Sequence, residues 1–289
     1  MRVIPAPTHL PEEVYKTCIN SISDQNLKHR LSLITSYVIA AAYEYYDKGQ
    51  SRQFSSIAPI LCKNEEIVVG SVTKSELKKT YSDHMVGASK PARHIYDLLL
   101  ANAPRRKCPL CGFGHATTLD HYLPKSKFPL LSVIPWNLVP ACKDCNTGKN
   151  SAIATSEYEQ TLHPYFEQRA VIDEQWLHAR VIPGTPPVLE FYVAPPQHWS
   201  RVNKARVESH FQNYKLATRF SIEASNELAS LKDIFSLLWD DLGIDGIQLH
   251  LQGTAQGKYC QHANSWDTAM YQALAASSWY LRGGFRDFL

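Results

Sequence analysis

Two cysteine pairs constrain this chain more than any other feature of its sequence. Cys108 and Cys111 form the first pair, Cys142 and Cys145 the second, and two residues separate the cysteines of each pair. Each pair can form a tight turn that directs two thiolates to one point, and four thiolates match the tetrahedral coordination of Zn²⁺. Thirty residues lie between the pairs, more than in a simple zinc ribbon, so a further element must be inserted there. The sequence predicts a four-cysteine zinc site that helps this segment to fold.

Alternatives to this site are a redox-active cysteine pair and a ligand set that includes His115. Four cysteines already complete a tetrahedron, and two pairs beside basic residues argue against redox chemistry. Four sulfurs also leave zinc no open position for a substrate, so we expect a structural metal and chemistry at other residues. The remaining cysteines, Cys18, Cys62 and Cys260, are predicted to be buried small apolar side chains.

The whole chain has the composition of an ordinary globular protein. It has 289 residues, of which 44% are hydrophobic and 20% charged, a length that suggests roughly two domains. An odd number of cysteines argues against a disulfide framework. No apolar run approaches the ~18 residues that cross a bilayer, and the first residues, "MRVIPAPTHLPEEVYK", lack the apolar stretch of a signal peptide. We expect a soluble cytoplasmic protein without membrane contact.

Apolar periodicity predicts an α+β fold that is mostly helical. Residues 1–103 read as a helical N-terminal region, in which "TKSE" (Thr73 to Glu76) is a capping box. Residues 104–165 form a cysteine- and proline-rich module, and 166–197 a β-hairpin built from "EQWLHARVI" and "VLEFYVA". Residues 198–289 read as a helical C-terminal region, whose last helix is capped by Asn264 or Ser265 and stops at Gly283 and Gly284.

Positive charge is concentrated in the central module. The net charge of the chain is only +3, but Pro104 to Asn150 holds seven lysines and arginines against two aspartates. This segment therefore carries +5 in 47 residues and the rest of the chain −2. Such a local field suits a polyanion such as nucleic acid, and the alternative is a solvated basic surface without a partner.

The insert between the cysteine pairs holds an Asp-His dipeptide and two asparagines. It begins at "LDHYLPKSK", which contains Asp120 and His121, and continues through "WNLVPACKDCNTGK", which contains Asn137 and Asn146. These stretches resemble the HNH endonucleases, ββα-metal nucleases whose members often carry a four-cysteine zinc. The resemblance covers roughly sixty residues, about a fifth of the chain, and agrees in residue types, order and spacing. It implies a central ββα-metal module and a metal-dependent nuclease that cuts DNA.

The resemblance also implies roles for single residues. His121 is the expected general base, because histidine can accept a proton near neutral pH. Asp120 and Asn146 are the expected ligands of one catalytic Mg²⁺ or Mn²⁺, which stabilises the phosphate and the departing oxygen. Asn137 matches an asparagine that orients the base and its loop. The expected phosphate contacts are Lys125, Lys127 and Lys149.

The chain departs from many HNH relatives at Asn146 and Asn150, where these carry histidines. Asparagine oxygen is a harder ligand than imidazole and favours Mg²⁺ or Mn²⁺ over a transition metal. Asn150 is an alternative second ligand or water anchor, because it would share a helix face with Asn146. His163, in "LHPYF", is either near the metal or a packed histidine.

The module also contains two large aromatic side chains that can pack or stack. Trp136 is expected in the core, and Tyr122 either in the core or on a stacking surface.

A second resemblance concerns the flanks. The module with "TLHPYF" and the late "NSWDTAMYQAL" is similar to stand-alone bacterial HNH proteins of anti-phage defence operons, such as Septu-type and Zorya-type nuclease subunits. It implies helical flanks that dock a partner ATPase or sensor. Double-stranded DNA is the default substrate, and nicking, single strands or RNA stay open. The alternatives are a zinc-stabilised nucleic-acid-binding module without catalysis and a zinc-stapled protein-interaction scaffold.

Overall fold

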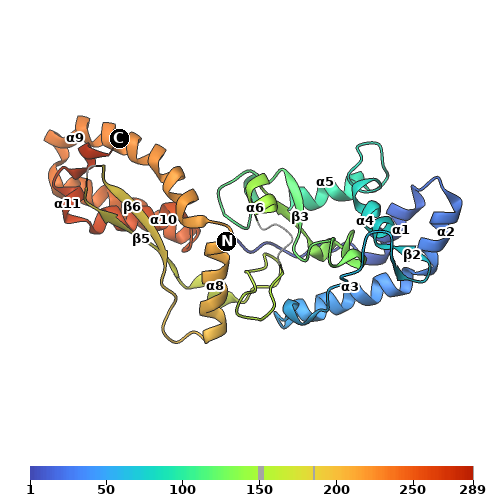
Figure 1. Ribbon diagram of the computed structural model, residues 1–289. Helices are drawn as coiled ribbons and strands as arrows, with labels where there is room; N and C mark the ends of the chain where they lie inside the picture. The colour runs from blue at the N-terminus through green and yellow to red at the C-terminus, as the bar shows by residue number, and fades with distance from the viewer. Residues whose placement is uncertain (149–152, 185, 289) are drawn as a thin grey trace. The chain divides into compact units, whose positions relative to one another are not determined.

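The protein consists of two compact units, Met1–Glu167 and Gln168–Leu289. The structure, a computed structural model, describes residues 1–148, 153–184 and 186–288. It is α+β and mostly helical, as predicted, and the sheets in its described part have two antiparallel strands each (Figure 1). None of the helices in these ranges is both long and apolar enough for a membrane span.

The first unit begins with helices. They are α1 (Pro11–Asn20), α2 (Gln25–Leu33), α3 (Thr35–Gln50), α4 (Lys74–Ser82) and α5 (Arg93–Ala101), with the 3₁₀ turn η1 (Phe54–Ser56) after α3. The predicted capping box at the start of α4 is confirmed. The Thr73 hydroxyl accepts a hydrogen bond from the Glu76 amide over 3.3 Å, and the Glu76 carboxylate accepts one from the Thr73 amide over 2.8 Å.

Helices alone were predicted for the first 103 residues, and this is wrong between α3 and α4. Strands β1 (Ile67–Val69) and β2 (Val72–Thr73) pair there as a short antiparallel hairpin. The run "IVVGSV" explains it, because β-branched residues favour extended backbone and Gly70 adopts a φ of +59° in the turn.

The centre of the first unit is a hairpin followed by a helix. Strand β3 (Thr118–His121) pairs antiparallel with β4 (Leu138–Ala141), so that His121 lies opposite Leu138. Helix α6 (Lys143–Gly148) follows β4 and packs on β3, and α5 packs on both strands (Figure 1). The connection between the strands holds the 3₁₀ turns η3 (Pro129–Leu131) and η4 (Pro135–Asn137). Both turns begin at a proline, whose fixed φ suits a first helical position.

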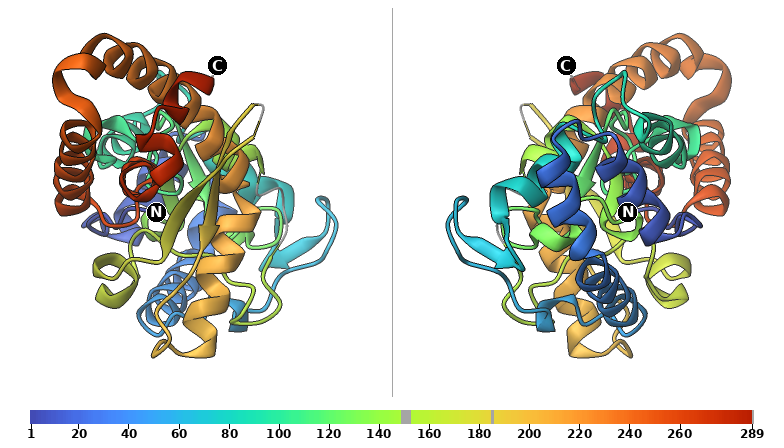
Figure 2. Two further views of the ribbon diagram at one scale, coloured as in Figure 1. Left: turned by 90° about the vertical axis from the view of Figure 1, so that its left-hand side faces the viewer. Right: turned by 90° about the vertical axis from the view of Figure 1, so that its right-hand side faces the viewer.

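The second unit is built on the predicted hairpin, which is confirmed. Strand β5 (Leu177–Ile182) pairs antiparallel with β6 (Val188–Val193). Around it lie α7 (Arg169–Asp173), α8 (Arg201–Asn213), α9 (Leu216–Gln261), α10 (Trp266–Ala276), α11 (Ser278–Leu281) and η5 (Gly284–Asp287). Helix α10 packs on β5, and α9 packs on β6 and α10. Helix α9 is kinked at Gly243, whose φ of +60° is not helical. The long orange helix is bent in the views of Figure 2.

The start of α10 shows which of the two predicted residues, Asn264 or Ser265, caps the helix. Ser265 is the N-cap, and its hydroxyl accepts a hydrogen bond from the Thr268 amide over 3.4 Å. Asn264 is buried and instead accepts hydrogen bonds from the backbone amides of Trp176 and Leu177, which fixes the start of β5. The helix ends at Ala276, and the short α11 continues toward Gly283.

Candidate functional site

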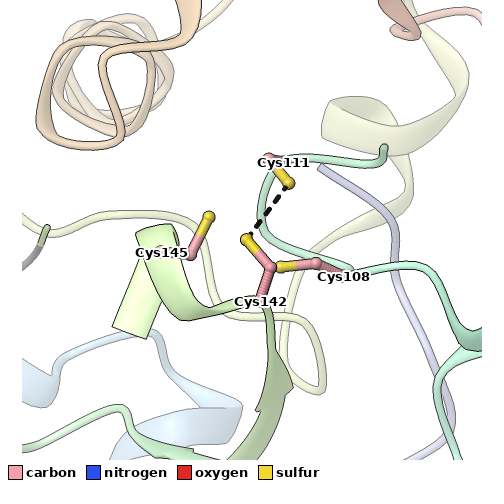
Figure 3. Close-up of side chains that lie close together, drawn as sticks. All are labelled: Cys108, Cys111, Cys142 and Cys145. Atoms are coloured by element: carbon pink, nitrogen blue, oxygen red, sulfur yellow. Dashed lines mark hydrogen bonds between the residues drawn. The ribbon is translucent and has the colours of Figure 1, made fainter. Parts of the chain in front are cut away.

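The four paired cysteines come together in one buried cluster. The Sγ atoms of Cys108, Cys111, Cys142 and Cys145 all lie within 4.8 Å of one another. Figure 3 shows that these side chains converge from a loop, the end of β4 and α6, with 3.9 Å between the sulfurs of Cys111 and Cys142. A zinc ion with four Zn–S bonds of about 2.3 Å has sulfurs ~3.8 Å apart. The cluster therefore fits a metal ion such as zinc.

The first cysteine pair forms a turn that needs its two glycines. The Gly112 amide donates a hydrogen bond to the Cys108 carbonyl over 2.8 Å, and Gly112 has a φ of +84°, which favours glycine. The Gly114 amide donates to the Cys111 sulfur over 3.4 Å. A Cβ atom on Gly114 would lie 2.9 Å from the Cys142 sulfur. The sequence "CPLCGFG" thus fixes two sulfurs and leaves room for a third.

The second pair lies where β4 passes into α6. Cys142 follows β4 directly and Cys145 lies in α6 (Figure 3), with the Asn146 amide donating to the Cys142 carbonyl over 3.0 Å. A hydrogen bond with the Cys108 thiol lowers the pKa of Cys111 to about 7 and the pKa of Cys142 well below its usual range. The hydrogen bond with Cys111 raises the pKa of Cys108, and the hydrogen bond with Cys108 raises the pKa of Cys145. Four thiolates at this spacing need a cation between them, which a bound metal supplies.

The other cysteines and His115 lie outside this cluster. Cys18 is buried as predicted, but Cys62 is half-buried and Cys260 is exposed, so the prediction of a buried side chain is wrong for Cys260. Cys260 occupies the last turn of α9, a position that faces solvent. His115 is exposed and forms a β-bridge with Lys107.

Asp120 and His121 end β3 and are both buried, with 7% and 9% of their surface exposed. The Nε2 atom of His121 lies 2.8 Å from the carbonyl oxygen of Ser132. A carbonyl only accepts hydrogen bonds, so Nε2 carries a proton and the lone pair of the neutral ring is at Nδ1. The strand and the inter-strand connection thus fix both the orientation and the tautomer of this ring.

Asn137 ties the segment after His121 to the end of η4. Its Oδ1 atom accepts a hydrogen bond from the Leu123 amide over 2.7 Å, and its Nδ2 atom donates to the carbonyls of Leu123 and Leu131, at 3.0 and 3.3 Å. The side chain is completely buried. These bonds use both ends of the amide, so Asn137 holds the backbone of Leu123 and Leu131 in place.

Asn146 reaches from α6 back to β3. Its Nδ2 atom donates a hydrogen bond to the Thr118 hydroxyl over 3.3 Å. Asp120 lies two residues after Thr118, and side chains two residues apart share a face of a strand. Asn146 and Asp120 therefore belong to the face of β3 on which α6 packs. Because the amide nitrogen binds Thr118, the amide oxygen of Asn146 is the atom that can hold a cation.

Tyr81, in α4, contacts two of the predicted site residues, His121 and Lys125. The sequence did not predict this contact. Its ring stands at 73° to that of His121 with 4.4 Å between centroids, and its hydroxyl donates to the Leu119 carbonyl over 3.2 Å. The Lys125 ammonium lies 4.5 Å from the centre of the same ring. The only sequence signal was the helical spacing of Leu77 and Tyr81, which predicts burial but not the neighbours.

The predicted basic residues have different surroundings. Burial lowers the pKa of Lys125, and the nearby charge of Lys78 lowers it further. The ammonium group lies over the ring of Tyr81 and is partly shielded from water. Lys127 is half-buried, and its carbonyl accepts a hydrogen bond from the Ile60 amide over 2.7 Å. Lys149 and Asn150 lie outside the described residues.

His163 is a packed histidine of the core. It is fully buried, its Nδ1 atom accepts a hydrogen bond from the Tyr165 amide over 3.0 Å, and its Nε2 atom lies 2.9 Å from the Tyr45 hydroxyl. The ring of Tyr122 lies 4.2 Å from it, so Tyr122 belongs to the core. Trp136 is also buried, as predicted, and its Nε1 atom donates to the Pro7 carbonyl over 3.1 Å.

The fold and this cluster define a mostly helical α+β protein with a candidate four-cysteine metal centre. Protein ea31 of Escherichia phage lambda is 30% identical to the chain over 300 residues, which include 98% of this chain and the whole of the phage protein. The chain therefore belongs to the same protein family as ea31. No protein-family model matches the chain, and no solved structure matches it significantly.

Proposed function

We propose that the protein is a metal-dependent HNH endonuclease that hydrolyses phosphodiester bonds in DNA. The observation that carries the proposal is the β3–β4–α6 arrangement beside the cysteine cluster. Asp120 and His121 end β3, and Asn146 of α6 reaches the face of β3 to which Asp120 belongs. Asp120 and Asn146 thus belong to one face of β3, and His121 follows Asp120 at the end of that strand, inside the basic segment of residues 104–150.

His121 acts as the general base in this proposal. With its Nε2 proton held by the Ser132 carbonyl, Nδ1 takes a proton from the attacking water. Asn137 is the positioning residue, because its bonds to Leu123 and Leu131 hold the segment that follows the histidine. The attacking water oxygen bonds to phosphorus, the bond to the 3′ oxygen breaks, and the departing oxygen takes a proton from solvent water.

The oxygens of Asp120 and Asn146 would hold one hard cation, Mg²⁺ or Mn²⁺, on the α6 face of β3. Bound there, such an ion neutralises charge on the phosphate and on the departing oxygen. The cysteine cluster has no open position and serves as the scaffold, because Cys145 precedes Asn146 in α6 and Cys142 follows β4. Lys125, Lys127 and Lys149 would contact phosphates on either side.

Plasmid cleavage tests the proposal. Supercoiled DNA incubated with the purified chain should become nicked or linear with Mg²⁺ or Mn²⁺ and stay intact with a chelator of divalent cations. Zinc content is measured in the same samples, because a chelator that removed the cysteine-bound metal would unfold the scaffold. DNA left intact with either ion while zinc is bound would contradict the proposal.

A second candidate is a zinc-stabilised nucleic-acid-binding module without catalysis. The low exposure of Asp120 and His121 favours it, since buried polar residues can serve packing alone. It predicts a shift of DNA in a gel at low salt together with uncut DNA in both ions. A role in anti-phage defence with a partner ATPase or sensor stays a prediction, to be tested by co-purification with the products of neighbouring genes.

A further inference from the structure

Two consecutive arginines have left-handed backbone just before the first cysteine pair. Arg105 has a φ of 54° and Arg106 a φ of 55°, in the turn η2 (Pro104–Arg106). Left-handed backbone is unfavourable for residues that carry a Cβ atom, and it persists where the surroundings impose it. Such backbone is concentrated at functional sites. The turn is therefore a place to look for a ligand.

Hydrogen bonds fix this turn on both sides. The Arg106 amide donates to the Ala103 carbonyl over 2.9 Å, and the Lys107 amide donates to the Pro104 carbonyl over 3.0 Å. The Arg106 carbonyl accepts a hydrogen bond from the Ala116 amide over 2.8 Å, which joins the turn to the segment that enters β3. The two arginines are thus presented from a rigid support and not from a loose loop.

The turn gathers four basic side chains, which we call the basic turn: Arg105, Arg106, Lys107 and His115. Both arginines and His115 are exposed, and the Lys107 ammonium lies 3.5 Å from Nε2 of His115. Among residues 1–148, 153–184 and 186–288, no carboxylate forms an ion pair with either arginine. Positive charges presented from a rigid turn attract an anion.

The position of the basic turn suggests which anion. Ala116, the partner of Arg106, precedes Asp120 by four residues, and four residues span at most about 14 Å. Phosphates on one strand of a duplex follow each other every ~3.4 Å along the axis. One guanidinium group can donate two parallel hydrogen bonds to two oxygens of the same phosphate, so arginine is well suited to this contact.

We propose that the basic turn binds the phosphate backbone of duplex DNA within roughly four nucleotides of the cleaved phosphate. This inference rests on the proposed nuclease function, and it adds a contact outside the ββα element. Because such contacts are to phosphate, they fix the position of the DNA without selecting a sequence.

The test uses glycine substitutions, since glycine adopts positive φ without strain and preserves the turn. Binding of the full chain to a short labelled duplex is measured at several salt concentrations without divalent ions. Each lost phosphate contact should lower the slope of log affinity against log salt by about 0.9. We therefore expect a fall of about 0.9 for Arg105→Gly and for Arg106→Gly, and about 1.8 for both together.

Arg52→Gly is the matched control, because Arg52 also has a positive φ, 57°, and lies in the same unit. It should leave the slope unchanged. The pair Arg105→Lys with Arg106→Lys keeps the charges, so it should retain the slope while affinity falls moderately. A wild-type slope in the double glycine variant, or an equal loss in Arg52→Gly, overturns the inference.

Failure of the proposed function gives a different result. A wild-type chain that neither binds nor cuts duplex DNA overturns both proposals. A wild-type chain that cuts plasmid, beside a double glycine variant with the same salt slope, overturns the basic turn alone. Thermal unfolding of the double glycine variant should occur at or above the wild-type temperature, because the left-handed positions are relieved.

Discussion

The Nε2 atom of His121 donates a hydrogen bond to the backbone carbonyl of Ser132 over 2.8 Å. This contact holds the ring in one tautomer, with its lone pair at Nδ1. A base must be unprotonated to work, so cleavage should rise with pH and level off once the imidazole is neutral. Single-turnover rates between about pH 5 and about pH 8 measure this. A rate that is highest at the acidic end would assign His121 another role.

Tyr81 offers a test of what orients that ring. Tyr81→Phe keeps the ring against His121 and Lys125 and loses only the bond to the Leu119 carbonyl. We expect it to cost about 1 kcal/mol of unfolding free energy and little activity. Tyr81→Ala removes the ring and should lower the cleavage rate at least tenfold, besides destabilising the chain by about 3 kcal/mol.

Tyr96→Ala is the control for destabilisation alone. Tyr96 is buried on α5 and its ring lies 6.4 Å from that of Tyr81, and within the described part of the chain no ring contact joins it to His121. Chemical unfolding and cleavage rates should show similar stability losses for the two alanine variants and a lower rate only for Tyr81→Ala. Equal rates would mean that Tyr81 serves packing.

Asn137 and Asn146 should behave in opposite ways. Asn137→Ala leaves the buried amide and carbonyl of Leu123 without their partner, so unfolding free energy should fall by about 3 kcal/mol. Asn146→Ala removes one hydrogen bond of a half-buried side chain, and we expect a loss below about 1 kcal/mol. Cleavage should nevertheless be abolished in Asn146→Ala, with Mg²⁺ binding weakened.

Urea unfolding and titration with Mn²⁺ check this contrast. Asn137→Asp serves as a second variant, since it keeps the acceptor for the Leu123 amide and faces two carbonyls with a carboxylate oxygen. It should be no more stable than the alanine variant. An Asn146→Ala protein that cuts DNA normally would remove Asn146 from the metal site.

The cysteine cluster should bind about one zinc ion per chain. Cys108→Ser and Cys142→Ser should lose the metal, and the first unit should become sensitive to protease, because the cluster joins a loop, β4 and α6. Cys260→Ser is the matched control, since Cys260 is exposed on α9 and lies outside the cluster. The zinc content of each variant is measured by metal analysis after gel filtration. Zinc retained in Cys108→Ser would show that the metal is elsewhere.

The features predicted correctly from the sequence are local ones. Each cysteine pair, the capping box at Thr73 and the β5–β6 hairpin follow from residue types at short spacings, and the two cysteine pairs meet although thirty residues separate them. The hydrogen bonds of Asn137 to Leu123 and Leu131 agree with the expected positioning of a loop. Such local features depend on a few residues at most, and for that reason they can be predicted from a single sequence.

The features that were missed depend on packing between distant segments. Tyr81 contacts His121, forty residues further along the chain, where α4 packs near the connection between β3 and β4. The exposure of Cys260 depends on which face of α9 is covered, and the strand pair β1–β2 is too short for a clear alternation. The left-handed backbone of Arg105 and Arg106 has no signal in residue type, since arginine ordinarily avoids it.

The most direct test of the account replaces the proposed base. Supercoiled plasmid is incubated with Mg²⁺ or Mn²⁺ and the wild type, His121→Ala, or His29→Ala, whose histidine is exposed on α2. We predict that His121→Ala keeps its zinc and cuts at least about 100-fold more slowly, while His29→Ala matches the wild type. Cleavage by His121→Ala at the wild-type rate would contradict it.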